Sequence, residues 1–160
     1  MSETTHDGFT PDPAKYLLIV VGSTLRCELT DRPLGYRLRE SILRWQDDAL
    51  EDEIDEAARR TPVVVTDVIY LNDSGLMSMP AICIGAPTSN AASAYHASRL
   101  PTAFVMEDVM RVQLDPEFID AKAALWGVDG SSTLSAVDLF AERYLPDFLA
   151  HLHHLPTDAA

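Results

Sequence analysis

Hydrophobic residues along the chain gather in short continuous runs, and most of these runs end in Gly or turn-forming residues. Apolar runs without alternation are typical of strands that are buried on both faces of a sheet. They predict four strands, at residues 15–22 (KYLLIVVG), 61–71 (TPVVVTDVIYL), 79–85 (MPAICIG) and 122–127 (KAALWG). Residues 102–114 (TAFVMEDVMRVQL) have two β-like halves, which predict a hairpin or a bent strand.

Helical spacing appears between these runs. Leu34, Leu38, Ile42 and Trp45 form one apolar stripe, and Asp31 is a suitable cap for a helix with Pro33 in its first turn. The Ala-rich residues 89–100 (SNAASAYHASRL) predict a second helix, capped by Ser89 or Asn90. A final helix is predicted to begin at Ser132 or Thr133, and Pro146 is expected to kink or shorten it.

Alternating strands and helices predict an α/β fold, a three-layer sandwich with a mainly parallel sheet in a single domain. The strand order is expected to be Rossmann-like or flavodoxin-like, and the pattern does not separate the two. We expect a disordered N-terminal arm over residues 1–15, the α/β domain over 16–150 and a flexible C-terminal tail over 151–160.

The amino-acid composition of the chain argues against two classes of binding partner, nucleic acid and membranes. The chain has 25 acidic against 12 basic residues and a net charge of −13, which disfavours binding to nucleic acid. No apolar run approaches the length of a membrane span, and the N-terminus lacks the pattern of a signal peptide, so we expect no membrane partner and a cytoplasmic location. Cys27 and Cys83 give no disulfide framework and are interpreted as small buried residues.

Two helix faces are candidates for a protein partner or for a homo-oligomer. Residues 46–60 (QDDALEDEIDEAARR) are strongly acidic, which fits either a solvated helix face or a docking face for a basic partner. The apolar stripe of the last helix, Phe140, Tyr144 and Phe148, would suit an interface in a structural subunit.

Small polar residues follow the ends of the predicted strands. If the strands are parallel, their loops meet at one edge of the sheet, where α/β proteins bind ligands. Helix N-termini in these loops would suit a small anionic ligand, although Gly followed by Ser, Thr or Asn is also ordinary turn and cap chemistry. The candidate ligand-binding residues are Gly22, Ser23, Thr24, Gly85, Ser89, Asn90, Gly127, Asp129, Ser131 and Ser132.

Asp67 and His96 are the candidate catalytic residues. Asp67 interrupts a β-branched run, where a buried carboxylate needs a partner or a proton. His96 is either a partly exposed helical histidine or a general base or metal ligand.

Residues 16–96 resemble the hydrogenase maturation endopeptidases in the order of a strand, a Gly-containing turn, an acidic residue and a helix, here IVVGSTLRCELTDRPLGYRL. The metal site of that family uses an acid after the first strand, an Asp at the second strand and a later His. The resemblance places these ligands on Glu28, Asp67 and His96 and implies a metal-dependent hydrolase or peptidase.

The sequence favours a small acidic α/β domain that acts in binding or as a scaffold and holds a small anionic ligand at the strand-end loops. No cofactor is identified, and whether the protein is an enzyme stays open. The alternative is the metal-dependent hydrolase, in which two carboxylates and an imidazole would hold an ion that activates water. That alternative requires Asp67 and His96 to converge.

Overall fold

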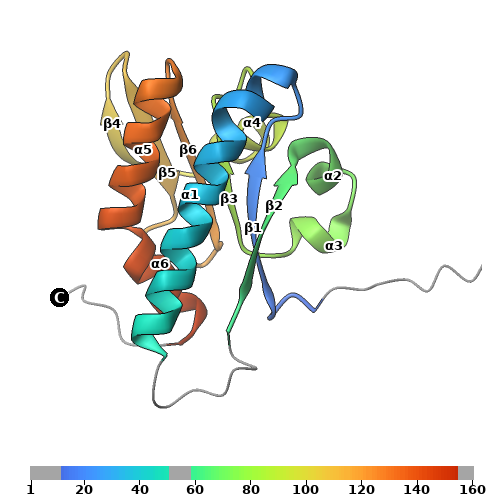
Figure 1. The fold of residues 1–160 in the computed structure, drawn as a ribbon, viewed down its shortest axis with the longest axis vertical. Helices are drawn as coiled ribbons and strands as arrows, with labels where there is room; N and C mark the ends of the chain where they lie inside the picture. Colours follow the sequence, from blue (N-terminus) through green and yellow to red (C-terminus); the bar gives the residue numbers. More distant parts are fainter. Residues whose placement is uncertain (1–11, 51–58, 155–160) are drawn as a thin grey trace, which may run out of the picture.

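A computed structural model describes residues 12–50 and 59–154 of the chain, which fold around one six-stranded sheet (Figure 1). The sheet order is β2-β1-β3-β6-β5-β4. Strands β2, β1, β3 and β6 are parallel, whereas β5 is antiparallel to both β6 and β4. The strands are β1 (Tyr16–Val21), β2 (Thr61–Thr66), β3 (Ala81–Ile84), β4 (Thr102–Met106), β5 (Met110–Leu114) and β6 (Lys122–Gly127).

The predicted α/β class with one sheet is confirmed, but the sheet is mixed. The hairpin alternative for residues 102–114 is confirmed, because β4 and β5 pair antiparallel. The four parallel strands follow the order β2-β1-β3-β6, which agrees with the start of the flavodoxin order, whereas the antiparallel hairpin outside β6 departs from both predicted arrangements. The physical reason is that antiparallel strands need only a tight turn, whereas a parallel strand needs a crossover.

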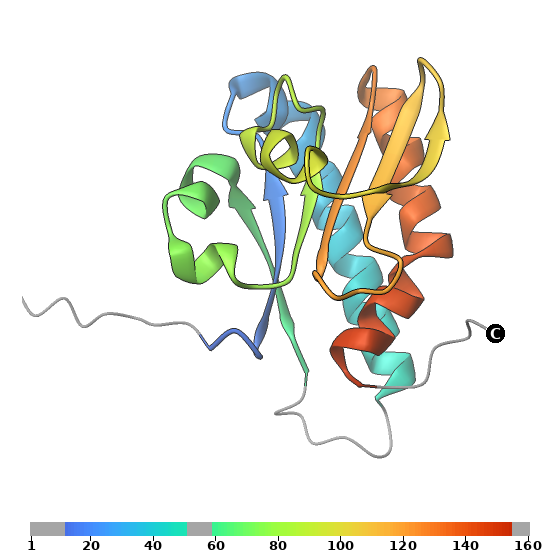
Figure 2. The same cartoon turned by 180° about the vertical axis from the view of Figure 1, so that it is seen from behind.

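Helices cover both faces of the sheet, as Figures 1 and 2 show. One face carries α1 (Leu25–Ala49), α5 (Gly130–Arg143) and α6 (Leu145–Leu152), and the other carries α2 (Asp67–Leu71), α3 (Ser74–Met77) and α4 (Ala91–Ala97). Successive residues of β1 point to opposite faces. Leu17, Ile19 and Val21 join the core under the long helices, and Leu18 and Val20 join the core under the short ones.

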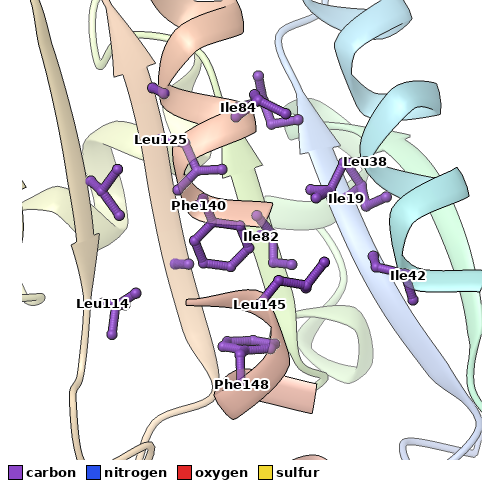
Figure 3. Packing of buried hydrophobic residues seen from close by; sticks show 14 of the residues in the cluster. Ile19, Leu38, Ile42, Ile82, Ile84, Leu114, Leu125, Phe140, Leu145 and Phe148 are labelled. Carbon is purple, nitrogen blue, oxygen red and sulfur yellow. The ribbon is translucent and has the colours of Figure 1, made fainter. Parts of the chain in front are cut away.

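The larger core is built from β-branched and leucine side chains of the sheet against one stripe of each long helix (Figure 3). Phe140 and Phe148 are each at most 1% exposed in this core. The apolar stripe that the sequence offered as an interface is therefore occupied within the domain. Only Tyr144 is half-buried, and its hydroxyl donates to the carbonyl of Ala103 on β4.

Three element boundaries differ from the prediction. Thr24 rather than Asp31 caps α1, so Pro33 lies inside that helix. Strand β2 ends at Thr66, whose side chain caps α2, so Asp67 begins a helix instead of interrupting a strand. Asp129 rather than Ser132 or Thr133 caps α5. The effect of Pro146 is as predicted, because the helix breaks at Tyr144 and α6 begins with Pro146 in its first turn.

Several predicted features fall outside the described residues. The predicted arm lies mostly in residues 1–11, the tail mostly in 155–160, and much of the acidic block in 51–58. Within the described part of the chain, no helix is long and apolar enough to cross a membrane.

Candidate ligand crevice at the carboxyl ends of the strands

A cavity of about 90 Å³ opens at the end of the sheet where β1, β3 and β6 terminate, and we call it the inner cavity. One liquid water occupies about 30 Å³, so the space suits a group of a few non-hydrogen atoms. Its wall combines the first turns of α1 with the loops after β3 and β6. Among its lining residues are Arg26, Cys27, Asp31, Gly85, Ser89 and Asp129.

The inner cavity lies beside a switch point in strand order. From β1 the chain crosses through α1 to β2 on one side, and then returns to β3 on the other side of β1. The crossovers therefore leave adjacent parallel strands in opposite directions, which opens a crevice beyond their carboxyl ends. Figure 1 shows the ends of β1 and β2 and the start of α1 at the same end of the molecule.

Asp31 supplies the most unusual side chain in the cavity wall. It is only 7% exposed and forms no ion pair among the described residues. Burial raises the pKa of this carboxyl group, and hydrogen bonds from Cys27 and Thr30 and the charge of Arg26 oppose that shift. The Thr30 hydroxyl lies 3.3 Å from Oδ1. Asp31 is therefore a buried acid with weak partners that faces a cavity.

Gly85 makes room for this carboxylate. Its φ of 120° is a conformation that side-chain-bearing residues rarely adopt, and a Cβ at this position would lie 2.8 Å from Asp31 Oδ2. The loop after β3 can therefore lie this close to Asp31 of α1 only because residue 85 is Gly.

The helix caps account for most of the polar residues that the sequence assigned to ligand binding. Thr24 accepts the amide of Cys27, and Asp129 accepts the amide and hydroxyl of Ser132. Asn90 is fully buried and accepts the amides of Ala92 and Ser93. These amides are among the groups that an anion at a helix N-terminus would need, and they are already occupied.

Four of the ten predicted residues line the inner cavity, namely Gly85, Ser89, Gly127 and Asp129. The other six do not, and they are Gly22, Ser23, Thr24, Asn90, Ser131 and Ser132. Gly22 instead allows a close approach, since a Cβ there would lie 2.4 Å from the carbonyl oxygen of Ser89. Part of the predicted set thus lines a cavity at the predicted edge of the sheet, but the polar residues at this edge mainly fix the loops.

The charges around the inner cavity do not favour an anion. Asp31 and Asp129 face one basic residue, Arg26, which is exposed. The hydrogen bonds with Ser132 lower the pKa of Asp129 and keep it ionised. Because two carboxylates stand against one guanidinium, the cavity is better matched to a cation or to a hydrogen-bond donor.

The predicted metal ligands do not come together. Glu28 pairs with Arg32 at 2.7 Å on α1. Asp67 accepts the amide of Val68 with one oxygen and the amide of Ala91 with the other, each at 2.8 Å, so it ties α2 to the start of α4. Across residues 12–50 and 59–154, no group of three or more His, Cys, Asp or Glu side chains is placed to hold a metal ion. The proposed set of Glu28, Asp67 and His96 is therefore wrong as a metal site.

His96 belongs to a buried polar contact beneath α4. It is 3% exposed, and its Nε2 lies 2.8 Å from the hydroxyl of Tyr70. Burial lowers the pKa of His96 to about 4, and the nearby positive charge of Lys122 acts in the same direction. Burial also raises the pKa of Tyr70. Both groups are neutral at pH 7, so the Tyr70 hydroxyl and the imidazole share one hydrogen bond whose direction follows the tautomer of the ring, and His96 faces Tyr70 rather than Asp67.

Sequence reasoning missed Arg26, Cys27, Thr30 and Asp31 as parts of the cavity, because it placed the start of the helix too late. The sequence nevertheless contained a pattern that indicates a buried position for Asp31. It precedes Gly35, Leu38 and Ile42 at intervals of four, three and four residues, which puts it on the buried stripe of α1. An acidic residue on the core stripe of a helix is uncommon and marks a position worth testing.

Comparison of the sequence with protein-family models and with curated proteins finds no match. The functional assignment therefore rests on the crevice itself.

Proposed function

We propose that this protein is a binding domain that holds a small polar ligand in the inner cavity, with a cationic or hydrogen-bond-donating group of the ligand against Asp31. The observation that carries the proposal is the burial of the Asp31 carboxylate in the wall of a cavity, without an ion pair among the described residues. A buried carboxylate is unfavourable unless a partner compensates it, and a bound cation would be that partner.

The position of the cavity supports the same proposal. Open α/β sheets bind ligands beyond the carboxyl ends of the strands at a switch point in strand order, and the inner cavity occupies such a point. The hydrolase alternative loses the residue set on which it depended, since Glu28, Asp67 and His96 each have separate partners.

Ligand-dependent thermal stability tests the proposal, with methylammonium, ethylammonium and methylguanidinium as cationic probes and acetate and phosphate as anionic probes. We expect the cations to raise the melting temperature, because a probe at 100 times its dissociation constant adds about 2.7 kcal/mol to the free energy of unfolding. The anions should give no shift beyond that of matched ionic strength.

Two variants locate the effect. Asp31→Asn keeps the size of the side chain but removes the charge, and it should abolish the response to cations. Glu40→Gln removes the same charge from an exposed position of α1 and should leave the response unchanged. Equal stabilisation of the wild type and Asp31→Asn, or stabilisation by anions alone, would show that the proposal is wrong.

A further inference from the structure

A second hollow of about 460 Å³ adjoins the inner cavity, and we call it the outer hollow. Its walls are the β4–β5 hairpin, the loop after β3 and the end of β6. The two spaces share four lining residues, Ala86, Thr88, Gly127 and Val128, so they lie next to each other. Together they reach the size of sites that enclose drug-sized molecules, which typically measure about 300–1,000 Å³.

The floor of the outer hollow is a strip of sheet that extends from β6 to the β4–β5 hairpin, beyond the short helices. In the strand register Val105 pairs with Arg111, and Arg111 pairs with Trp126, so these three side chains form one row across β4, β5 and β6. Trp126 packs against the core under the short helices, which places the row on that face of the sheet. Figure 2 shows α2, α3 and α4 over the other strands and none of them over the hairpin.

The row presents apolar surface to the crevice. Val105 is 40% exposed, and Trp126 is half-buried, so part of its indole remains accessible. Val109 and Val128 add exposed apolar groups to the same walls. An aromatic platform beside a small polar cavity suits a ligand with one polar and one apolar end.

The charges of the outer hollow agree with those of the inner cavity. Glu107 and Asp108, at the hairpin turn, line it together with one basic residue, Arg111. The whole crevice therefore holds four carboxylates and two guanidinium groups. This balance favours a ligand that is cationic as a whole.

We infer that the ligand is an amphipathic amine, with its ammonium group against Asp31 in the inner cavity and an aromatic or alkyl group on Trp126 and Val105 in the outer hollow. This inference rests on the proposed function and extends it from a polar group to a chemical class. A contact with Trp126 also gives the inference its own optical signal.

Calorimetric titration with a graded series of amines tests the inference, using ethylammonium, 2-phenylethylammonium and tryptamine. The aromatic amines should bind at least tenfold more tightly than ethylammonium, because only they reach the outer hollow. In a Trp45→Phe variant, Trp126 is the sole tryptophan. Its emission should change on addition of 2-phenylethylammonium, which has no indole of its own, and stay constant with ethylammonium.

A substitution in the outer hollow should separate the two ends of the ligand. Val105→Lys places a long cationic side chain at an exposed edge-strand position, where lysine is well tolerated. It should weaken binding of tryptamine at least tenfold and leave binding of ethylammonium within twofold. Val68→Lys adds the same charge at an exposed position of α2 and is the matched control.

The outcomes distinguish this inference from the proposed function. Binding of all three amines with equal affinity, dependent on Asp31 and without a change in Trp126 emission, would retain the proposed function and overturn the amphipathic ligand. Failure of every amine to bind would overturn both. Tighter binding of tryptophan than of tryptamine, lost in Arg111→Gln, would show that Arg111 selects a carboxylate and that the ligand is not a simple amine.

Discussion

At the scale of single residues, the crevice depends on one glycine and one acid that fit each other. Gly85 has a φ of 120°, and the space in front of its Cα is taken by the carboxylate of Asp31. The backbone of the loop after β3 therefore lies directly against the Asp31 side chain of α1, with no side chain of the loop between them.

Gly85→Ala should lower the free energy of unfolding by about 2 kcal/mol or more, because alanine strains the backbone at this φ and its Cβ meets Asp31. Urea denaturation measures the change.

Gly130→Ala is the matched control. A Cβ at Gly130 meets no atom within 4 Å, and the residue lies in the first turn of α5, so alanine should be neutral or stabilise by up to about 1 kcal/mol. Equal destabilisation by the two substitutions would contradict the close approach at Gly85.

At the scale of elements, Asn90 joins two strands to one helix. Its amide nitrogen donates to the carbonyl oxygens of Val20 on β1 and Ile84 on β3, at 3.0 and 2.9 Å. Its amide oxygen accepts the first amides of α4. All of these groups are buried, so one side chain satisfies polar atoms of three elements at the switch point.

Asn90→Ala should destabilise the domain by about 3 kcal/mol or more, since it removes four buried hydrogen bonds and with them the cap of α4. Chemical denaturation checks this value, and Asn72→Ala serves as the control. Asn72 is exposed and donates one hydrogen bond to Val68, so its loss should cost less than about 1 kcal/mol. A loss at Asn90 as small as that at Asn72 would contradict a joining role.

The strands were predictable where apolar residues form an unbroken run. They were less predictable where a helix-capping side chain ends the strand within such a run. The apolar runs of β1, β3 and β6 were recognisable as strands from the sequence, and so were the two halves of the β4–β5 hairpin. The run VVVTDVIY continues in β-branched residues, yet the Thr66 side chain caps the amide of Ile69 and turns the chain into α2. A local hydrogen bond here overrides β-propensity.

The candidate site was less predictable than the fold, because it arises from the approach of segments that are distant in sequence. The sequence pointed to the edge of the sheet where the inner cavity lies, and its candidate residues included Gly85 and Asp129, which line that cavity. It did not indicate that Asp31 would face Gly85, which lies 54 residues further on, because that contact depends on how α1 packs against the sheet. The sequence predicted the hairpin at residues 102–114 but not its place beside β6, on which the outer hollow depends.

At the scale of the whole molecule, the buried titratable groups determine how stability changes with pH. The two clearest groups act in opposite directions. Burial raises the pKa of Asp31, which favours the folded state as the pH falls, whereas burial lowers the pKa of His96. Comparing the wild type with a variant at His96 isolates the effect of His96, because Asp31 is the same in both proteins.

An unfolded histidine has a pKa near 6.5, and in the folded protein the pKa of His96 is about 4. Between these values the unfolded chain binds a proton that the folded chain does not, so acid favours unfolding. The contribution of His96 is complete above pH 6.5 and is lost as the pH falls toward 4, by at most about 3 kcal/mol.

His96→Gln removes the titration and keeps a side chain that can donate a hydrogen bond to the Tyr70 hydroxyl or accept one from it. Urea denaturation of both proteins between pH 7.5 and pH 4 should therefore show a stability difference that is constant above pH 6.5 and moves in favour of the variant below it. Parallel curves over the whole range would mean that His96 is protonated equally in the folded and unfolded states.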